Sequence, residues 1–522
     1  MSKQSLGPAS PTNYEKNHFF YLSKPIFGMK KESDQLEIEN ILHHLNYRWN
    51  IEALAQWEGT RRVPFKPDQI YKGYEIFLSH ETLERIDKLK NKSAGTRLKF
   101  GLIDHFLQRS LLPHETEMRG WMHGAAAIVN EKHIYFRDII PWCQKSSTYQ
   151  SRQILQKETG PLCKFLKPFA LNFWNILLNI LEEEFGFTGY MNYCQKKKGI
   201  DYLYFYHYLK TFLLKTDDLY FTAMECWSRE RFGLPLNKLT RFDAIHILSL
   251  VQFDDFFPEK AMEKLICFFN QWRIDLKNTP GLNLKLEREE KRSSQGICFI
   301  LQVPEEVYVL MQPEGGWVDM ETLSHELGHG LAAVFTSPEL SMIDREMATS
   351  FSLSESYAFL LQNMALSRPF LKEYLGMDSG EVKELVHYKM LKDLSVFRRY
   401  AAKFISEFEM FSKGDLSDGE SYARIMARYT GFYHQPESHL FDLVPEFYSL
   451  DYLLGWMGES IMERYLSESL GTGWMLRNET GDILKKWWSQ GNRFDIFEFF
   501  KINGLGSLTT DLLLKRWEGN LS

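Results

Sequence analysis

The sequence predicts a mainly α protein, a large multi-helix body that carries a small β-hairpin or sheet. Apolar residues recur at three- and four-residue spacing through most of the 522 residues, whereas strand-like runs are confined to one short stretch. Aromatic residues make up 15% of the chain, which is enough to fill the interfaces between long helices. With 44% hydrophobic and 25% charged residues, the composition is typical of a globular protein.

The chain divides into three parts by pattern. Residues 1–30 are rich in Pro and Gly and predict an irregular lead-in. Residues 31–195 predict an N-terminal helical lobe, and residues 196–522 a second, larger region. Helical patterns occur at 35–59, 80–91, 161–186, 199–214, 241–253 and 260–276.

The pattern changes near residue 296. Two β-rich runs, 296–303 and 307–312, are separated by Pro304-Glu305-Glu306, which predicts a hairpin. The exposed edge of such a hairpin can pair with an extended peptide, and the hairpin can equally serve only to pack the next helix. That helix is predicted over 319–335 and is ended by Ser337-Pro338.

The rest of the chain is predicted to be helical. A helix over 344–366 is followed by an unusually long one over 380–411, which we expect Ser379 to cap. Further helical patterns occupy 445–466 and 483–491.

Charge and cysteine patterns exclude several classes of function. The net charge is −6 with no basic block, so nucleic-acid binding is not expected, and Lys196-Lys197-Lys198 is interpreted as solvated surface charge. No apolar run reaches the ~18–20 residues needed to cross a bilayer, and the N-terminus lacks an apolar signal core. The six cysteines are scattered without a CxxC pair, which predicts reduced, mostly buried thiols in a cytoplasmic protein. Nothing in the pattern sets an oligomeric state.

The pentapeptide His325-Glu326-Leu327-Gly328-His329 is the most specific signal in the chain. On a helix, positions i and i+4 lie on one face, so two imidazoles can hold one metal ion with a glutamate beside them as general base. His80-Glu81 and His114-Glu115 lack the second histidine. Gly328 and Gly330 disfavour a helix and would let another backbone approach closely. We therefore predict one Zn²⁺ per chain, bound by His325 and His329.

A catalytic zinc normally takes a third protein ligand. The downstream carboxylates are Glu339, Asp344, Glu346 and Glu355. Glu346 lies near the predicted start of the second helix, where the helix dipole alone favours an acid. Glu355 lies within a helix among small and apolar neighbours, where a carboxylate is costly to bury unless it is paired or metal-bound. Glu355 is the preferred candidate, although a solvated glutamate remains the alternative.

The segment 321–331, followed by Glu355 26 residues after His329, resembles the thimet oligopeptidase and oligoendopeptidase F group of zinc metallopeptidases. The resemblance covers about residues 201–513. It implies a zincin-type body with a deep cleft between two helical lobes, with zinc on His325, His329 and Glu355 and Glu326 as the general base. It also implies that tyrosines near the C-terminus, here Tyr448 and Tyr452, stabilise the oxyanion. Family members carry a histidine just before these tyrosines; the nearest upstream here are His434 and His439.

The resemblance implies hydrolysis of short unstructured peptides, because helices that wall off the zinc exclude folded proteins. Three other functions stay open. A helical metallocarboxypeptidase similar to the carboxypeptidase Taq group would need a cation for the terminal carboxylate of its substrate. A catalytically impaired peptide-binding homologue would retain only the scaffold. A metal-independent helical interaction protein would use both histidines as core residues.

Overall fold

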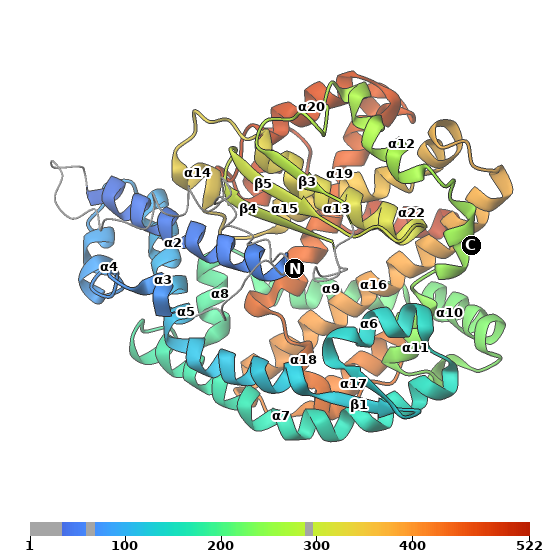
Figure 1. Cartoon of the computed structure of the whole chain (residues 1–522), viewed down its shortest axis with the longest axis horizontal. Coiled ribbons are helices and arrows are strands. Elements are labelled where there is room, and N and C mark those ends of the chain that lie inside the picture. The colour runs from blue at the N-terminus through green and yellow to red at the C-terminus, as the bar shows by residue number, and fades with distance from the viewer. Residues whose placement is uncertain (1–33, 59–67, 288–295, 522) are drawn as a thin grey trace, which may run out of the picture.

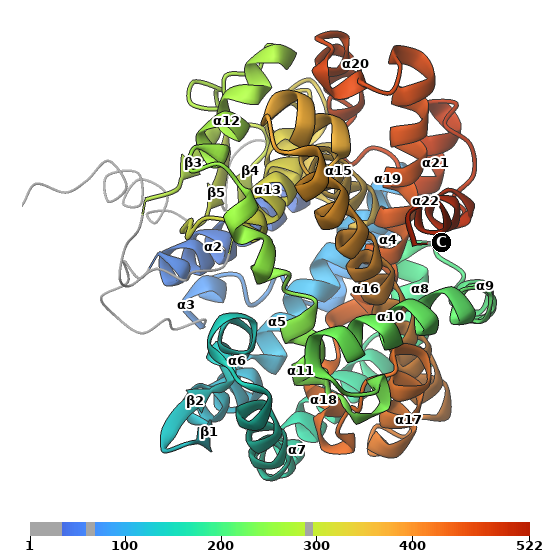
Figure 2. The ribbon, with the colours of Figure 1, turned by 90° about the vertical axis from the view of Figure 1, so that its right-hand side faces the viewer.

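The computed structural model describes residues 34–58, 68–287 and 296–521 (Figure 1). The predicted lead-in at 1–30 lies outside these described residues. The prediction of a mainly α fold is confirmed, because helices dominate the described chain and its strands form only two small sheets. The β1–β2 hairpin, α6 and α7 lie at one end of the molecule, and α12 and α20 lie at the other (Figure 2).

The N-terminal part is built on three long helices and a short hairpin. The Asn91 side chain accepts a hydrogen bond from the Ala94 backbone N–H at the start of one helix, and Thr148 and Ser151 form a capping box at the start of another. The elements are α2 (Asp34–Trp57), α3 (Asp68–Tyr71), α4 (His80–Asp87), α5 (Lys92–Gly124), β1 (Ala126–Val129), β2 (Lys132–Tyr135), α6 (Ile139–Pro141), α7 (Tyr149–Glu183) and α8 (Tyr190–Lys198).

The larger region contains the second sheet and the remaining helices. It begins with α9 (Tyr202–Lys215), α10 (Asp217–Phe232), α11 (Arg241–Ile247), α12 (Ala261–Phe268), β3 (Leu282–Lys285), β4 (Ile297–Gln302), β5 (Glu306–Leu310) and α13 (Trp317–Val334). It continues with α14 (Met342–Glu346), α15 (Ser352–Ala365), α16 (Ser379–Lys413), α17 (Gly419–Thr430), α18 (His439–Asp442), α19 (Tyr448–Leu470), α20 (Glu479–Trp488), α21 (Ile496–Ile502) and α22 (Asp511–Leu521).

Two predictions about helix starts were wrong. The predicted helix over 344–366 is broken: residues 344–346 belong to the short helix α14, and α15 begins only at Ser352. The long helix α16 is capped by Asp378 and not by Ser379: the Asp378 carboxylate accepts hydrogen bonds from the Gly380 and Glu381 backbones. The partial positive charge at the N-terminal end of a helix also stabilises a carboxylate at this position.

The predicted hairpin is confirmed as β4 and β5, which pair antiparallel. The short strand β3, which was not predicted, pairs parallel with β5, so β4 lies at the edge of the sheet. Ile51 and Leu54 of α2 pack against Leu301 and Tyr308 on one face of this sheet. On the other face, a Cβ added at Gly330 of α13 would lie 2.8 Å from a Val309 methyl. The sheet is thus enclosed between α2 and α13.

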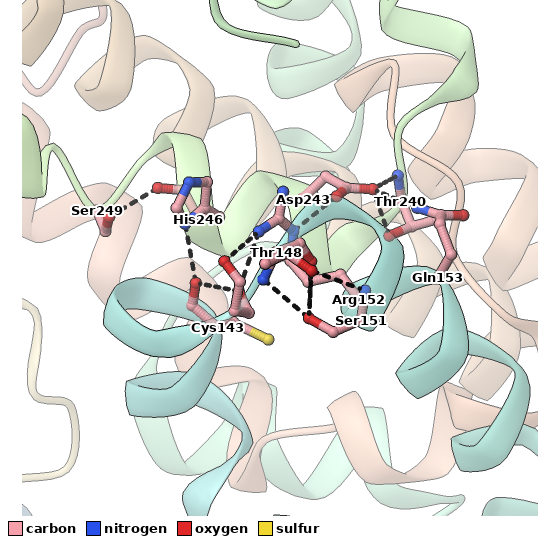
Figure 3. A network of polar contacts seen from close by, with 10 residues as sticks. Cys143, Thr148, Ser151, Arg152, Gln153, Thr240, Asp243, His246 and Ser249 are labelled. Carbon is pink, nitrogen blue, oxygen red and sulfur yellow. Dashed lines mark hydrogen bonds and ion pairs between the residues drawn. The ribbon is translucent and has the colours of Figure 1, made fainter. Parts of the chain in front are cut away.

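One large apolar core runs from Ile38 in α2 to Trp517 in α22. The predicted division at residue 195 falls within α8 and stays a prediction. A buried ion pair also joins the two parts: Arg152 Nε of α7 donates to Asp243 Oδ1 of α11 at 2.7 Å (Figure 3). Arg152 is 1% exposed and Asp243 is fully buried.

All six cysteines are free thiols; Cys143, Cys163 and Cys194 are buried, whereas Cys226 and Cys267 are exposed. Among the helices of the described ranges, we find none with both the length and the apolar character that crossing a membrane requires.

Candidate metal centre

The helix α13 presents the HExxH residues from a rigid position. Leu323, Leu327 and Leu331 form its apolar stripe and are fully buried. Its first turn is fixed because the Asp254 carboxylate accepts a hydrogen bond from the Trp317 N–H at 3.1 Å. His325, Glu326 and His329 therefore lie on one face of a helix whose other face is fixed by packing.

The structure brings Glu355 of α15 to both imidazoles. His325 Nε2 lies 3.6 Å from Glu355 Oε2, and His329 Nε2 lies 3.6 Å from Glu355 Oε1. Potential ligand atoms of the three residues all lie within 4.8 Å of one another. Within the described ranges, these residues form the one group of histidine, cysteine and carboxylate side chains arranged to hold a metal ion.

The other candidate ligands lie elsewhere. Glu346 bonds His43 Nδ1 at 2.6 Å and the Val303 N–H at 3.2 Å, which joins α14 to α2 and to the sheet. Asp344 accepts from Arg97 at 3.0 Å, and Glu339 is exposed. Of the four carboxylates, Glu355 is the one that lies beside both imidazoles.

Close helix crossings, which depend on two glycines, bring the three side chains together. A Cβ added at Gly328 of α13 would lie 2.4 Å from the Ala358 Cα of α15. A Cβ added at Gly455 of α19 would lie 2.4 Å from the Glu355 Cβ. The helix α15 is thus held between α13 and α19, and the predicted close approach at Gly328 is confirmed.

Side chains of α15 also orient both imidazoles. His325 Nδ1 bonds Gln362 Oε1 at 2.9 Å, and His329 Nδ1 bonds Ser354 Oγ at 2.7 Å. The Gln362 amide donates to Glu321 at 3.0 Å, so its oxygen faces His325 and Nδ1 carries the proton. The Nε2 of His325 is then an unprotonated nitrogen that faces Glu355, as a metal ligand requires, and the Nε2 of His329 faces the same carboxylate.

None of the three side chains His325, His329 and Glu355 carries a positive charge at neutral pH. Burial lowers the pKa of His325 to about 4 and that of His329 to about 3, so both imidazoles are neutral and their contacts with Glu355 are not ion pairs. Burial raises the pKa of Glu355 to about 8, although the Tyr448 hydrogen bond opposes this shift. Glu355 is 1% exposed, and its Oε2 atom has no hydrogen-bond partner among the described residues. Two neutral nitrogens and a buried carboxylate with an unsatisfied oxygen form a donor set that fits a divalent cation.

Glu326 lies beside this group in a position suited to proton transfer. Burial raises its pKa to about 7, and a hydrogen bond with the Cys298 backbone of β4 opposes the shift. A carboxylate with a pKa near neutrality is a suitable general base, because it is both ionised often enough and basic enough.

The two predicted tyrosines make different contacts with the candidate metal ligands. The Tyr448 hydroxyl donates to Glu355 Oε1. The Tyr452 ring lies 6.2 Å from the His325 ring and packs edge-on against Phe359 at 4.7 Å. Among the described residues, the Tyr452 hydroxyl makes no hydrogen bond, and the side chain lines a cavity with His325 and Glu326.

Sequence reasoning missed one aromatic neighbour. Tyr400 of α16 packs on Tyr452 with ring centroids 4.6 Å apart. It lies within a long apolar helical pattern, where nothing distinguishes it from an ordinary core residue.

Neither upstream histidine reaches the group. His434 is buried against the Tyr422 hydroxyl at 3.4 Å, and burial with nearby Arg241 lowers its pKa to about 3. Both ring nitrogens of His439 contact backbone carbonyls, those of Pro436 and Leu416. These bonding partners belong to α17 and to turns next to it in the chain.

Two cavities flank the candidate centre. One of about 270 Å³ is lined by His325, Glu326, Tyr452 and Lys392. The other, of about 440 Å³, lies between the N-terminal helices and the sheet, and its lining includes His329, Ser354, the β4 backbone segment 298–301, and Asn46 and Asn50 of α2. Of the two, only the second lies between the N-terminal helices and the larger region, where the sequence predicts a cleft, and the three ligand candidates lie between the two cavities.

Fold and site together define a mainly α protein with a two-histidine, one-glutamate candidate metal centre. A crystal structure from Chlamydophila abortus, described as a "putative peptidase", has a similar fold. The two agree with a TM-score of 0.63 over 97% of this chain and 95% of that one, at 13% sequence identity. At this identity the likeness shows the fold alone. No family model matches the chain, and no curated protein matches it.

Proposed function

We propose that this chain is a zinc-dependent endo-oligopeptidase of the thimet oligopeptidase and oligoendopeptidase F type. The observation that carries the proposal is the convergence of an HExxH helix on a buried Glu355 whose second oxygen has no partner among the described residues. His325, His329 and Glu355 would hold the ion. Zinc bound there would polarise the scissile carbonyl and acidify water.

The residues of the chain would perform the proton transfers. Glu326 takes the proton of the attacking water and delivers it to the leaving amine. Tyr452, which lines the same cavity as Glu326, donates a hydrogen bond to the developing oxyanion. Tyr448 has a different role from the one the family implies, because its hydroxyl holds the Glu355 carboxylate in place.

The paired charges of the cleft favour an endopeptidase over a carboxypeptidase. The cations that line the two cavities all have acidic partners: Arg97 with Asp344, Lys197 with Asp104, Arg345 with Glu305 and Lys392 with Glu321. A terminal carboxylate would have to displace one of these partners. An extended peptide could instead lie along the β4 edge and be cut internally.

An internally quenched peptide blocked at both ends tests the proposal. We expect the wild type to cleave it and Glu326→Gln to lose at least about 10²-fold in kcat while keeping its zinc. Glu81→Gln makes the same change in the exposed His80-Glu81 pair and should not affect turnover.

Near-normal turnover by Glu326→Gln would contradict the assigned base. Cleavage only of peptides with a free C-terminus would favour the carboxypeptidase, and a zinc-loaded wild type without turnover would favour the impaired homologue.

A further inference from the structure

The helix α19 begins after an unusual turn. Glu446 has φ 55° and ψ 34°, and Phe447 has φ 52° and ψ 39°, so two consecutive residues with side chains adopt the left-handed conformation. Residues other than glycine rarely adopt it, and a bulky pair does so only where surrounding contacts enforce it. Tyr448, whose hydroxyl holds Glu355, is the next residue.

The contacts that enforce this turn come from α8. Lys198 Nζ donates to the Glu446 carbonyl, and Lys197 Nζ donates to Glu446 Oε1 at 2.6 Å. The Tyr190 hydroxyl accepts from the Glu446 N–H at 2.6 Å. One helix therefore binds the backbone donor, the backbone acceptor and the side chain of Glu446. The interpretation of Lys197 and Lys198 as solvated charge was wrong; only Lys196 of the three is exposed.

The same lysine also ties α19 to the helix of the third ligand. Lys198, 4% exposed, donates to Oδ2 of the fully buried Asp451. Asp451 Oδ1 accepts from Ser350 Oγ at 2.6 Å and from Ser352 Oγ at 2.8 Å. Ser352 is the first residue of α15, three residues before Glu355. The Lys198–Asp451 pair thus joins α8, α19 and α15 at the turn that precedes Tyr448.

We infer that Lys198, with Lys197, is a positioning residue that fixes the Glu446–Phe447 turn and thereby holds the Tyr448 hydroxyl on the Glu355 carboxylate. The inference rests on the proposed function for its catalytic consequence, whereas the clamp itself does not depend on activity. Loss of Lys198 frees the turn, so Tyr448 leaves Glu355 and the ligand carboxylate loses its orientation. Lys198 itself lines neither of the two cavities, so a bound peptide loses no direct contact with it.

The test compares Lys198→Met with Lys196→Met, the same change at the exposed neighbour. Hydrogen exchange of the 446–452 amides should become faster in Lys198→Met and stay at the wild-type rate in Lys196→Met, whatever the activity. In the quenched-peptide assay, Lys198→Met should lower kcat about ten- to hundred-fold with KM within about twofold of wild type. Wild-type exchange in Lys198→Met would overturn the clamp.

The double variant Lys198→Met/Asp451→Asn separates positioning from stability. It removes the unpaired buried carboxylate, so it should regain stability lost by Lys198→Met. It does not restore the tie to the turn, so kcat should stay low and exchange fast. Recovery of kcat together with stability would overturn the positioning role. An inactive wild type would contradict the proposed function alone, because the exchange comparison still tests the clamp.

Discussion

At the scale of single residues, the burial of Glu355 has a free-energy cost that metal binding would offset. A carboxylate that is 1% exposed and has an oxygen without a partner among the described residues is unfavourable unless it takes up a proton or a cation is bound. The neutral imidazoles of His325 and His329 do not supply a charge. A bound divalent cation would neutralise the carboxylate and use both Nε2 lone pairs.

The hydrogen bonds behind the imidazoles give a prediction for zinc affinity. Ser354→Ala and Gln362→Ala each remove the hydrogen-bond partner of a histidine Nδ1, so each should weaken zinc binding about 10- to 100-fold. Competition with a chromophoric chelator measures the affinity. Ser356→Ala, on the same helix but bonded to the Ser352 carbonyl, is the matched control. Unchanged affinity in both variants would argue against metal binding through Nε2.

Glu407 gives a prediction for the pH dependence of stability. Burial raises its pKa from 4.5 to about 7, with Lys403 opposing the shift. Because the folded pKa is the higher one, the folded state holds the proton more tightly, and stability falls as pH rises from about 4.5 to about 7. Relative to wild type, Glu407→Gln should gain about 2–3 kcal/mol of unfolding free energy between pH 5 and pH 8.

Urea unfolding at the two pH values measures this difference. The exposed Glu384→Gln on the same helix should show no such gain. A Glu407→Gln difference that is flat with pH would show that the carboxyl titrates normally.

The three candidate ligands could be proposed from the sequence because each has a local signal. His325 and His329 are one helical turn apart, and Glu355 has neighbours that indicate burial. The roles of Tyr448, Tyr400 and Lys198 could not be predicted, because each depends on contacts between helices far apart in the chain. Lys198 lies 253 residues from Asp451, and a run of three lysines gives no sign of burial.

At the scale of elements, the hairpin and most helices follow from periodicity, whereas their limits depend on tertiary contacts. The strand β3 is only four residues long and gains its place by pairing with β5, which local sequence does not reveal. The break between α14 and α15 likewise reflects partners outside the segment: Asp344 and Glu346 are bound by Arg97 and His43 of the N-terminal helices.

The Arg152–Asp243 pair gives a prediction for the joining of elements. Asp243 also accepts hydrogen bonds from Gln153 and Thr240, so Arg152→Met leaves a bonded but uncompensated buried carboxylate (Figure 3). The variant should lose about 3–5 kcal/mol of unfolding free energy in urea denaturation. Adding Asp243→Asn should recover part of the loss, and the exposed Arg119→Met should change little. A loss below about 1 kcal/mol would contradict the account of this network.

At the scale of the whole molecule, the site lies inside the cleft. The cavity on the His329 side is bounded by Asn46 and Asn50 of α2 and by α5 residues such as His105 and Gln108. Asn50 also donates a hydrogen bond to the Ile300 carbonyl of β4 at 2.9 Å. The Asn50 side chain thus occupies part of the β4 edge along which a peptide substrate would bind. We therefore propose that only a short stretch of extended peptide can bind along this path.

We therefore predict that a cleavage sequence is hydrolysed as a free peptide but not when it is displayed in a loop of a folded domain. Mass spectrometry of the two digests decides between the outcomes, with the unfolded form of the same domain as the positive control. Cleavage of the folded domain at the peptide's rate would contradict an enclosed site.

The most direct test of the central claim is the zinc content of the purified full chain, measured by elemental analysis after zinc loading and dialysis. The account predicts about one zinc per chain in wild type and in Glu326→Gln, and well below one in a His325→Ala/His329→Ala variant. A wild type without zinc, or a double histidine variant that still holds one zinc per chain, would contradict it.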